Sequence, residues 1–162
     1  MLWILYHKCA GAREFGGSLQ KSSPCTGGDI ARRFTELPGA SAFFLGGAVT
    51  YTNAVKTELA GVPEALLEEK TAVSREVAQA MAEGIRERLG ADLGVSVTGL
   101  AGPDGDGVHE VGTVFIALAA EGETFVRETH MGSTRTRGFI RRMAGNHAFD
   151  MLRRYLSGMK VE

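Results

Sequence analysis

Hydrophobic residues recur along this chain with two different periods, which predict helices alternating with strands. Apolar positions at helical spacing predict helices in the segments 29–37, 53–59, 64–69, 74–89 and 139–156. Alternating or continuous apolar runs predict strands at 42–51, 93–98, 113–119 and 124–129. We expect the first of these to be buried and the last two to form a hairpin around Gly122. This order of elements predicts an α/β fold, a three-layer α/β/α sandwich with a mixed sheet.

The amount of apolar sequence limits the number of domains. With 162 residues, of which 44% are hydrophobic, the chain can form one compact domain with a core of its own. Glycines interrupt any periodicity near the start of the chain. We therefore expect residues 1–17 to form an irregular extension and residues 18–162 to form a single domain.

Charge and cysteine content argue against several classes of function. A net charge of −1 with dispersed basic residues argues against a nucleic-acid partner, and the apolar residues 1–6 are too few to span a membrane. Cys9 and Cys25 form no CxxC pattern, and the four histidines form no HExxH pattern. We therefore expect a soluble protein of the reducing cytoplasm, with no metal and no cofactor.

Three glycine-rich or capped junctions between the predicted elements are the candidate site, because ligands of α/β sheets bind where strand ends meet helix starts. These junctions are the segments 22–28, 50–56 and 98–112. The first reads Ser-Ser-Pro-Cys-Thr-Gly-Gly, which is typical of a tight turn at a helix start. Such a turn offers N–H groups to an anion or an oxyanion, although an ordinary loop has the same composition.

The second junction contains Tyr51, Asn53 and Lys56. A lysine near a helix start faces the positive end of the helix dipole, which disfavours its charged form. If it is also partly buried, Lys56 can act as a neutral base that activates a hydroxyl or thiol nucleophile. The alternatives are a solvated helical lysine for Lys56 and a helix N-cap for Asn53.

The third junction opens with Thr-Gly-Leu-Ala-Gly-Pro at 98–103, whose glycines allow backbone N–H groups to approach a phosphate or carboxylate closely. A plain turn has similar residues, and neither the GxxxxGK[ST] nor the GxGxxG pattern is present. Arg137 and Arg141 lie one helical turn apart, which suits either an anionic ligand or a solvated face. We favour the solvated face.

Taken together, the three junctions resemble the family of the CinA carboxyl-terminal domain, which also occurs alone as the nicotinamide mononucleotide deamidase PncC. The family pattern Ala-Glu-Ser-Cys-Thr-Gly-Gly is similar to residues 22–28. The similarity covers roughly residues 24–156 and includes the late Arg-x-x-hydrophobic-Arg element at 137–141. In between, the matching segments are 38–41, 44–47, 49–56, 72–74, 80–82, 98–103 and 111–114.

The resemblance implies an amidohydrolase for pyridine nucleotide salvage, which converts nicotinamide mononucleotide to nicotinate mononucleotide and ammonia. In the family a serine attacks the carboxamide, a lysine matching Lys56 is the base, helix-start N–H groups hold the oxyanion, and no metal is required. The expected partner is a small pyridine nucleotide, and a homo-oligomer is compatible with the sequence. By the same resemblance, the residues expected to bind the nucleotide are Thr26, Gly27, Gly28, Tyr51, Asn53, Thr98, Gly99 and Gly102.

One position departs from the family pattern. Pro24 stands where the family has its nucleophilic serine, and Ser23 stands where it has glutamate. Because proline has neither a nucleophilic side chain nor an N–H, the resemblance implies an amidohydrolase with weak or lost activity.

Three interpretations of this departure remain open. In the first, the domain is a catalytically silent member that binds nucleotide or serves regulation or assembly. In the second, Ser23 or Cys25 takes the place of the nucleophile. In the third, the amino terminus has diverged or is misassigned. A cysteine at a helix start is expected to have a lowered pKa, although a small buried filler is the favoured interpretation of Cys25.

Overall fold

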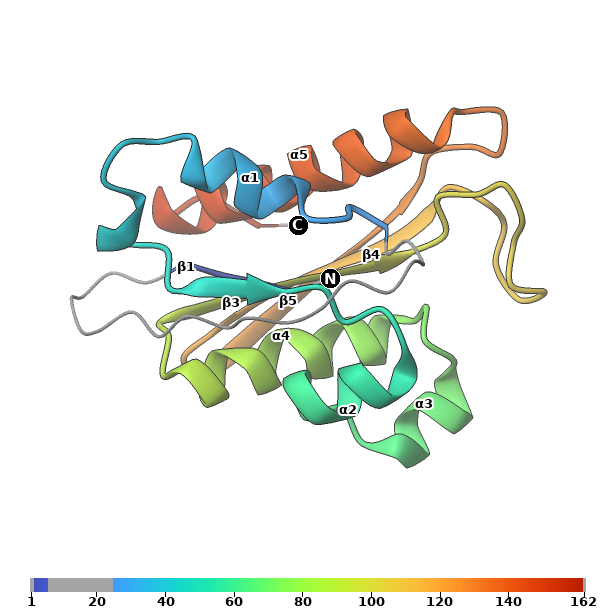
Figure 1. The fold of residues 1–162 in the computed structure, drawn as a ribbon, viewed down its shortest axis with the longest axis horizontal. Helices are drawn as coiled ribbons and strands as arrows, with labels where there is room; N and C mark the ends of the chain where they lie inside the picture. Colours follow the sequence, from blue (N-terminus) through green and yellow to red (C-terminus); the bar gives the residue numbers. More distant parts are fainter. Residues whose placement is uncertain (1, 6–24, 162) are drawn as a thin grey trace.

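The computed structural model describes residues 2–5 and 25–161, which form a five-stranded sheet between two layers of helices (Figure 1). The predicted α/β fold with three layers is confirmed. In chain order the elements are β1 (Leu2–Leu5), α1 (Asp29–Thr35), a short 3-10 helix (Ala40–Ala42), β2 (Gly46–Ala48), α2 (Asn53–Ala60), α3 (Glu64–Lys70), α4 (Arg75–Leu89), β3 (Leu93–Gly99), β4 (Thr113–Ala120), β5 (Glu123–His130) and α5 (Arg137–Leu156).

The sheet has the strand order β2-β1-β3-β4-β5, and each pairing between the described strands is antiparallel. This corrects the expectation of a mixed sheet. The helical crossover from β2 through α4 to β3 does connect two strands that run in the same direction. However, β1 lies between them and pairs with both, so the parallel strands are not neighbours.

Strand β1 lies within residues 1–17, for which the sequence predicts an irregular extension. Its register with β3 pairs Leu2 with Ser96 and Leu5 with Leu93. The boundary placed between residues 17 and 18 lies outside the described residues and stays a prediction.

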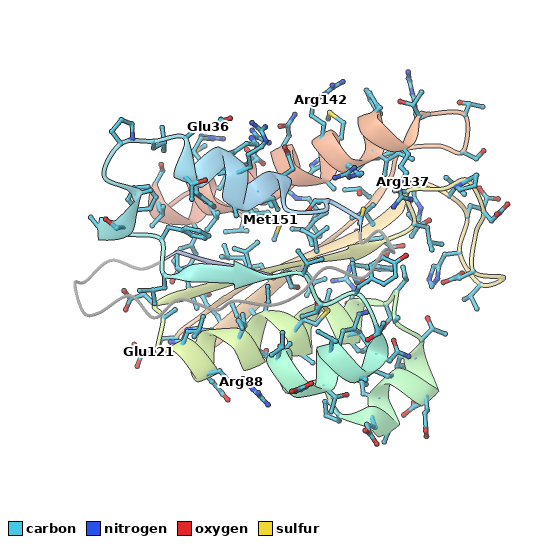
Figure 2. All side chains as sticks on the ribbon, in the orientation of Figure 1. Glu36, Arg88, Glu121, Arg137, Arg142 and Met151 are labelled. Atoms are coloured by element: carbon cyan, nitrogen blue, oxygen red, sulfur yellow. The ribbon has the colours of Figure 1, made fainter. Side chains whose placement is uncertain are left out.

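Helices α1 and α5 cover one face of the sheet, and α4 covers the other, with α2 and α3 outside it (Figure 1). The apolar side chains of β3 and β4 that face α5 include Val95, Val97 and Ile116, and they form one core cluster with Ile140 and Met151. Figure 2 shows Met151 between α5 and the sheet, whereas Glu36 and Arg142 point away from this layer. The predicted stripe on the last helix is therefore the core-facing side of α5.

The opposite side of β3 carries the small and polar members of the predicted alternation, and it packs against α4. A Cβ at Gly94 would collide with the carbonyl oxygen of Ala82, so only glycine allows this close approach of helix and strand. Next along the strand, the hydroxyl of Ser96 donates to the carbonyl oxygen of Ala78 at 2.5 Å. Both faces of β3 are thus buried, and the hydroxyls on the α4 side are satisfied by backbone carbonyls.

The segment 42–51 corrects a second expectation, that of a buried strand. Only Gly46–Ala48 pairs as a strand, at the edge of the sheet, and Val49 is 45% exposed. Two consecutive glycines supply no side chains to bury, and a strand at the edge of a sheet has a neighbouring strand on one side only. The consequence is that residues 49–52 leave the sheet early and lead to α2.

The end of α5 and the segment after it are tied to β5 by a cluster of four side chains. Asp150 accepts hydrogen bonds from Arg127 at 3.0 Å, from Arg153 at 3.0 Å and from Arg154 at 2.9 Å. Arg127 also donates to the carbonyl oxygen of Val161 at 2.7 Å. We call Arg127, Asp150, Arg153 and Arg154 the Asp150 cluster.

None of the helices in the described part of the chain is long and apolar enough to cross a membrane.

Candidate functional site

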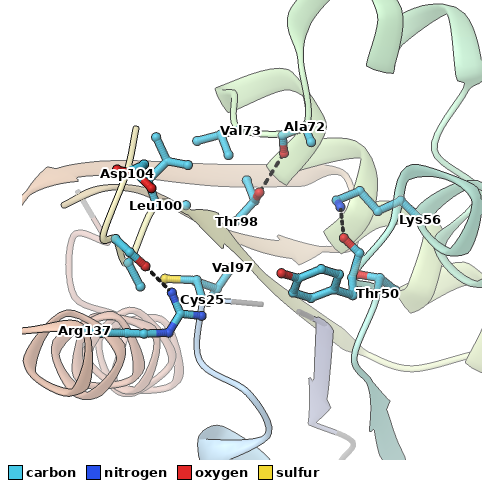
Figure 3. Close-up of a pocket in the computed structure, with 14 residues that line it drawn as sticks. Cys25, Thr50, Lys56, Ala72, Val73, Val97, Thr98, Leu100, Asp104 and Arg137 are labelled. Carbon is cyan, nitrogen blue, oxygen red and sulfur yellow. Dashed lines mark hydrogen bonds between the residues drawn. The ribbon is translucent and has the colours of Figure 1, made fainter. Parts of the chain in front are cut away.

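A pocket of about 310 Å³ opens where the segments before α2, before α4 and after β3 meet the start of α5 (Figure 3). Two of the three predicted junctions, 50–56 and 98–112, contribute most of its wall, and Cys25 contributes from the first. The lining residues are Cys25, Thr50, Tyr51, Lys56, Ala72, Val73, Val97, Thr98, Gly99, Leu100, Ala101, Gly102, Asp104 and Arg137.

Lys56 is positioned by α2, which begins immediately after the N-cap Thr52. The hydroxyl of Thr52 accepts a hydrogen bond from the N–H of Val55, so Thr52 is the cap and Asn53 is the first residue of the helix. The lysine is only 5% exposed, and its Nζ donates to the carbonyl oxygen of Tyr51 at 3.2 Å. Burial lowers the pKa of Lys56, which favours the neutral amine that a proton acceptor requires.

The other two predicted residues of this junction lie differently. Tyr51 lines the pocket and is 37% exposed. Asn53 is exposed on α2 and does not line the pocket. Its role in substrate binding therefore stays a prediction without support from the pocket geometry.

Cys25 lines the pocket and belongs to the core beneath α1 and α5, with 4% of its surface exposed. Burial raises the pKa of its thiol to about 11, and the nearby positive charges of Arg137 and Arg141 offset this only in part. The expected lowering of the pKa of Cys25 by a helix start is therefore wrong, because desolvation of the thiolate outweighs the electrostatic attraction. The favoured interpretation, a small buried filler, agrees with this environment. Ser23 and Pro24 lie outside the described residues.

The turn that follows Cys25 leads directly into α1. Thr26 is fully buried, and its carbonyl oxygen accepts hydrogen bonds from the N–H of Asp29 and from a guanidinium nitrogen of Arg141, the latter at 3.0 Å. Gly28 is the N-cap of α1 in the left-handed region, with φ of 94°. Thr26, Gly27 and Gly28 do not line the pocket but hold the position of Cys25 at its edge.

The segment 98–103 forms a second wall of the pocket. The hydroxyl of Thr98 donates to the carbonyl oxygen of Ala72 at 2.6 Å, which ties the end of β3 to the turn before α4. A Cβ at Gly99 would lie 2.7 Å from the carbonyl oxygen of Thr113, so this position allows no side chain. Gly102 has φ of 82°, and its carbonyl oxygen accepts a hydrogen bond from Arg137 at 2.6 Å. The glycines thus set the path of the backbone around the pocket.

Arg137 and Arg141 correct the interpretation of a solvated face. Arg137 bonds to the segment 98–103 and Arg141 to the turn after Cys25, so the first turns of α5 fasten two separate parts of the site. The sequence contains a signal for this, because both arginines are in helical register with the buried residues Ala144 and Ala148. Arg137, for which the solvated face was favoured, lines the pocket, and so does Asp104, which lies in the predicted junction 98–112 but was not singled out.

Comparison with known proteins agrees with this arrangement. The family described as "CinA C-terminal domain" matches residues 13–156 of the chain. The chain belongs to the CinA family. Curated CinA-like proteins from Desulfovibrio desulfuricans and Geobacter metallireducens are 46% and 49% identical over 153 and 145 residues, which is 93% and 89% of the chain. The chain spans 36% and 35% of their lengths, or about a third.

Solved structures of CinA proteins share the fold. A CinA superfamily protein from Escherichia coli is similar with a TM-score of 0.77 and 30% identity, over 82% of this chain and 76% of that one. The competence/damage-inducible protein CihA from Agrobacterium tumefaciens is similar with a TM-score of 0.72 and 38% identity, over 80% of this chain and 79% of that one. The resemblance drawn from the three junctions is therefore confirmed at the level of the family.

Proposed function

We propose that this CinA-family domain binds a pyridine mononucleotide in the pocket and is an amidohydrolase with weak or lost turnover. The full reaction would convert nicotinamide mononucleotide to nicotinate mononucleotide and ammonia. The observation that supports a ligand here is the burial of Lys56 against a pocket whose other walls are the segment 98–103 and Arg137. A buried lysine with a lowered pKa is uncommon away from functional sites.

The size and lining of the pocket suit a small polar ligand. Its volume of about 310 Å³ is at the lower end of the range for small-molecule sites, roughly 300–1,000 Å³. Arg137 supplies positive charge for a phosphate, and Val73, Val97 and Leu100 supply apolar contact for a ring. These features support a mononucleotide better than a larger dinucleotide.

Hydrolysis of the carboxamide requires a new bond from oxygen to the carbonyl carbon, loss of the C–N bond and a proton for the departing ammonia. Where a serine is present at position 24, its hydroxyl oxygen attacks and the neutral amine of Lys56 accepts the proton, which then goes to the departing ammonia. Water hydrolyses the ester that remains on the serine and releases the carboxylate product. Pro24 offers no such oxygen. Cys25 is a poor substitute, because a thiol with a pKa of about 11 is almost entirely protonated near pH 7.

The second candidate function is a nucleotide-binding domain without turnover, which serves regulation or assembly. It is favoured by the same two observations, the proline at position 24 and the raised pKa of Cys25. In both cases the pocket takes the same ligand, and the two functions differ only in whether ammonia is released.

Ammonia release by the purified chain from nicotinamide mononucleotide decides between the two functions. We expect slow or undetectable release by the parent chain and at least about a tenfold gain in Pro24→Ser, because one positioned nucleophile with a base typically contributes more than this factor. Pro24→Ala is the matched control, since it removes the proline without adding a hydroxyl. The gain should disappear in Pro24→Ser combined with Lys56→Met.

Two results would contradict parts of this proposal. Turnover by the parent that survives in Ser23→Ala combined with Cys25→Ala would exclude both residues as replacement nucleophiles. No thermal stabilisation of the parent by millimolar nicotinamide mononucleotide would count against the ligand itself, because a ligand that binds the folded state raises its Tm.

A further inference from the structure

Thr50 is a pocket residue that was not among the predicted site residues, and its environment is unusual. It follows β2 by two positions and lies between Val49 and Tyr51, which are 45% and 37% exposed. Thr50 itself is 1% exposed and lines the pocket. The N–H of Tyr51 donates to the carbonyl oxygen of Val49 at 3.0 Å, so the chain makes a tight turn at Thr50 that buries this side chain and leaves its two neighbours exposed.

The hydroxyl of Thr50 is buried and has no hydrogen-bond partner within residues 2–5 and 25–161. This is costly, because a hydroxyl that loses water and gains no partner is destabilising. Thr98, on the neighbouring wall of the same pocket, shows the usual solution, since its hydroxyl donates to the carbonyl oxygen of Ala72. A destabilising buried hydroxyl in the wall of a pocket indicates that the hydroxyl serves to bind a ligand rather than to stabilise the fold.

The two ends of the pocket differ in chemistry (Figure 3). Arg137 and Asp104 lie at one end, Thr50 and Lys56 lie at the other, and Thr98 lies between them. A guanidinium suits the phosphate of a mononucleotide. With the phosphate at Arg137, the other end of the ligand lies beside Thr50. In a pyridine mononucleotide that opposite end is the planar carboxamide.

We infer that the Thr50 hydroxyl is a specificity group that hydrogen bonds to the carboxamide of the bound ligand beside Lys56. A hydroxyl both donates and accepts, so it can donate to the amide oxygen or accept from the amide NH₂. This inference rests on the proposed function for the identity of the ligand. It assigns to Thr50 a role in binding the amide and no role in the chemical step.

The chain offers a matched control for Thr50. Thr57 lies on α2, its hydroxyl is likewise buried without a partner in the part of the chain that the structure describes, and it does not line the pocket. Replacement of either threonine by valine keeps the shape of the side chain and removes one hydroxyl. Each variant therefore loses one buried hydroxyl without a partner, and of the two only Thr50 lies where the ligand can reach it.

The test is isothermal titration calorimetry of the parent chain, Thr50→Val, Thr50→Ser and Thr57→Val with two probes, nicotinamide mononucleotide and ribose 5-phosphate. We expect Thr50→Val to weaken binding of nicotinamide mononucleotide about tenfold, the upper range for one hydrogen bond between neutral groups. Thr50→Ser should bind like the parent, and so should Thr57→Val. Ribose 5-phosphate has no amide, so its Kd should not change in any variant.

Each alternative result contradicts the inference in a distinct way. Equal weakening for both probes would mean that Thr50 shapes the pocket without contacting the amide. Unchanged affinity of Thr50→Val for nicotinamide mononucleotide would mean that the hydroxyl makes no contact with it. A fall in the Tm of Thr50→Val that Thr57→Val does not show would mean that the hydroxyl has a partner within the protein. If the parent binds neither probe, the proposed function fails as well, and that outcome is separate from the other three.

Discussion

The pocket and the Asp150 cluster are two polar regions of one small domain, and they treat polar groups in opposite ways. In the pocket, Lys56 is buried with one carbonyl partner, and the hydroxyl of Thr50 has no partner among the described residues. In the Asp150 cluster, one carboxylate accepts hydrogen bonds from three arginines. The first region leaves hydrogen-bonding capacity open, and the second uses it fully.

The pKa values of the two regions reflect this difference. Burial lowers the pKa of Lys56 and raises that of Cys25, so both pocket groups are displaced toward their neutral forms. Hydrogen bonds from Arg153, then Arg127 and Arg154, hold the pKa of Asp150 well below its ordinary value, so this group is displaced toward its charged form. Polar groups in the Asp150 cluster therefore stabilise the fold, whereas the burial of Lys56 and Thr50 in the pocket lowers its stability.

The largest effect that would sharpen this comparison is the low reactivity of Cys25. In a Cys9→Ser background, alkylation of Cys25 by iodoacetamide at pH 8 should be about 100-fold slower than that of an ordinary thiol, because a pKa of about 11 in place of 9.0 leaves about 100-fold less thiolate. The rate should keep rising about tenfold per pH unit above pH 9. The same variant unfolded in urea is the control and should react at the ordinary rate. Fast labelling of the folded chain at pH 8 would show that the thiol is not desolvated.

The next largest effect concerns the cluster. Asp150→Asn should lower the free energy of unfolding by about 1–2 kcal/mol at pH 7, which allows for the partial exposure of the carboxylate. The contribution of Asp150 is complete above its unfolded pKa, near 3.8, and is lost as the pH falls through its lower native pKa. Urea unfolding of both chains at pH 7 and at pH 3 measures this.

The matched control for Asp150 is Glu36→Gln, since Glu36 pairs with Arg32 on an exposed surface of α1. That variant should change stability by less than about 0.5 kcal/mol. Equal effects of the two substitutions would mean that three arginine partners are worth no more than one exposed pair.

A smaller effect is expected where the pocket region does have a satisfied polar contact, between Arg141 and the carbonyl oxygen of Thr26. Arg141→Met keeps the apolar stem and removes this bond, and should lower the free energy of unfolding by about 1 kcal/mol. Arg142→Met is the control on the same helix, because Arg142 is exposed. Hydrogen exchange should also accelerate at residues 25–28 in the first variant only. Unchanged exchange there would show that Arg141 does not hold the turn.

The smallest effect is the dependence of stability on Lys56 and pH. The native pKa of Lys56 lies below 10.5, so the unfolded state binds more protons between the two values and stability rises with pH in that window. The slope stays below the limit for one proton, about 1.4 kcal/mol per pH unit. Lys56→Met should flatten the rise as the pH approaches 10.5, and Lys70→Met, at an exposed lysine, should keep it. All variants are made in a Cys25→Ala background, because the raised pKa of Cys25 gives the opposite trend in the same window.

Elements with both a clear period and a cap were predictable from the sequence. The helix predicted at 74–89 has its N-cap at Ser74, whose hydroxyl accepts from the N–H of Val77, and its C-cap at Gly90. The hairpin of β4 and β5 follows from two apolar runs around Gly122. By contrast, the pairing of β1 between β2 and β3 depends on contacts over more than 40 residues, which no local pattern contains. For that reason the sequence predicts a mixed sheet, whereas the two parallel strands of the crossover are separated by β1.

The candidate site shows the same division. Lys56 was identifiable because a cap and a strand end fix its position, and its burial then follows from α2. The pKa of Cys25 was not predictable, because its sign depends on whether desolvation or nearby charge is larger, and burial is set by α5 from the other end of the chain. The same distance in sequence hides the contact of Arg137 with Gly102. Patterns along the chain locate single residues of a site, and contacts between distant segments decide their chemistry.

The attachment of two pocket segments to α5 also determines when the site can form during synthesis. Arg141 is 115 residues beyond Thr26, so the turn after Cys25 is made long before its anchor exists. At a ribosomal rate of about 5–20 residues per second, this delay lasts roughly 6–23 s. A nascent chain that lacks α5 should therefore contain Lys56 on a helix but no complete pocket, and ligand binding should begin only when the last helix has left the ribosome.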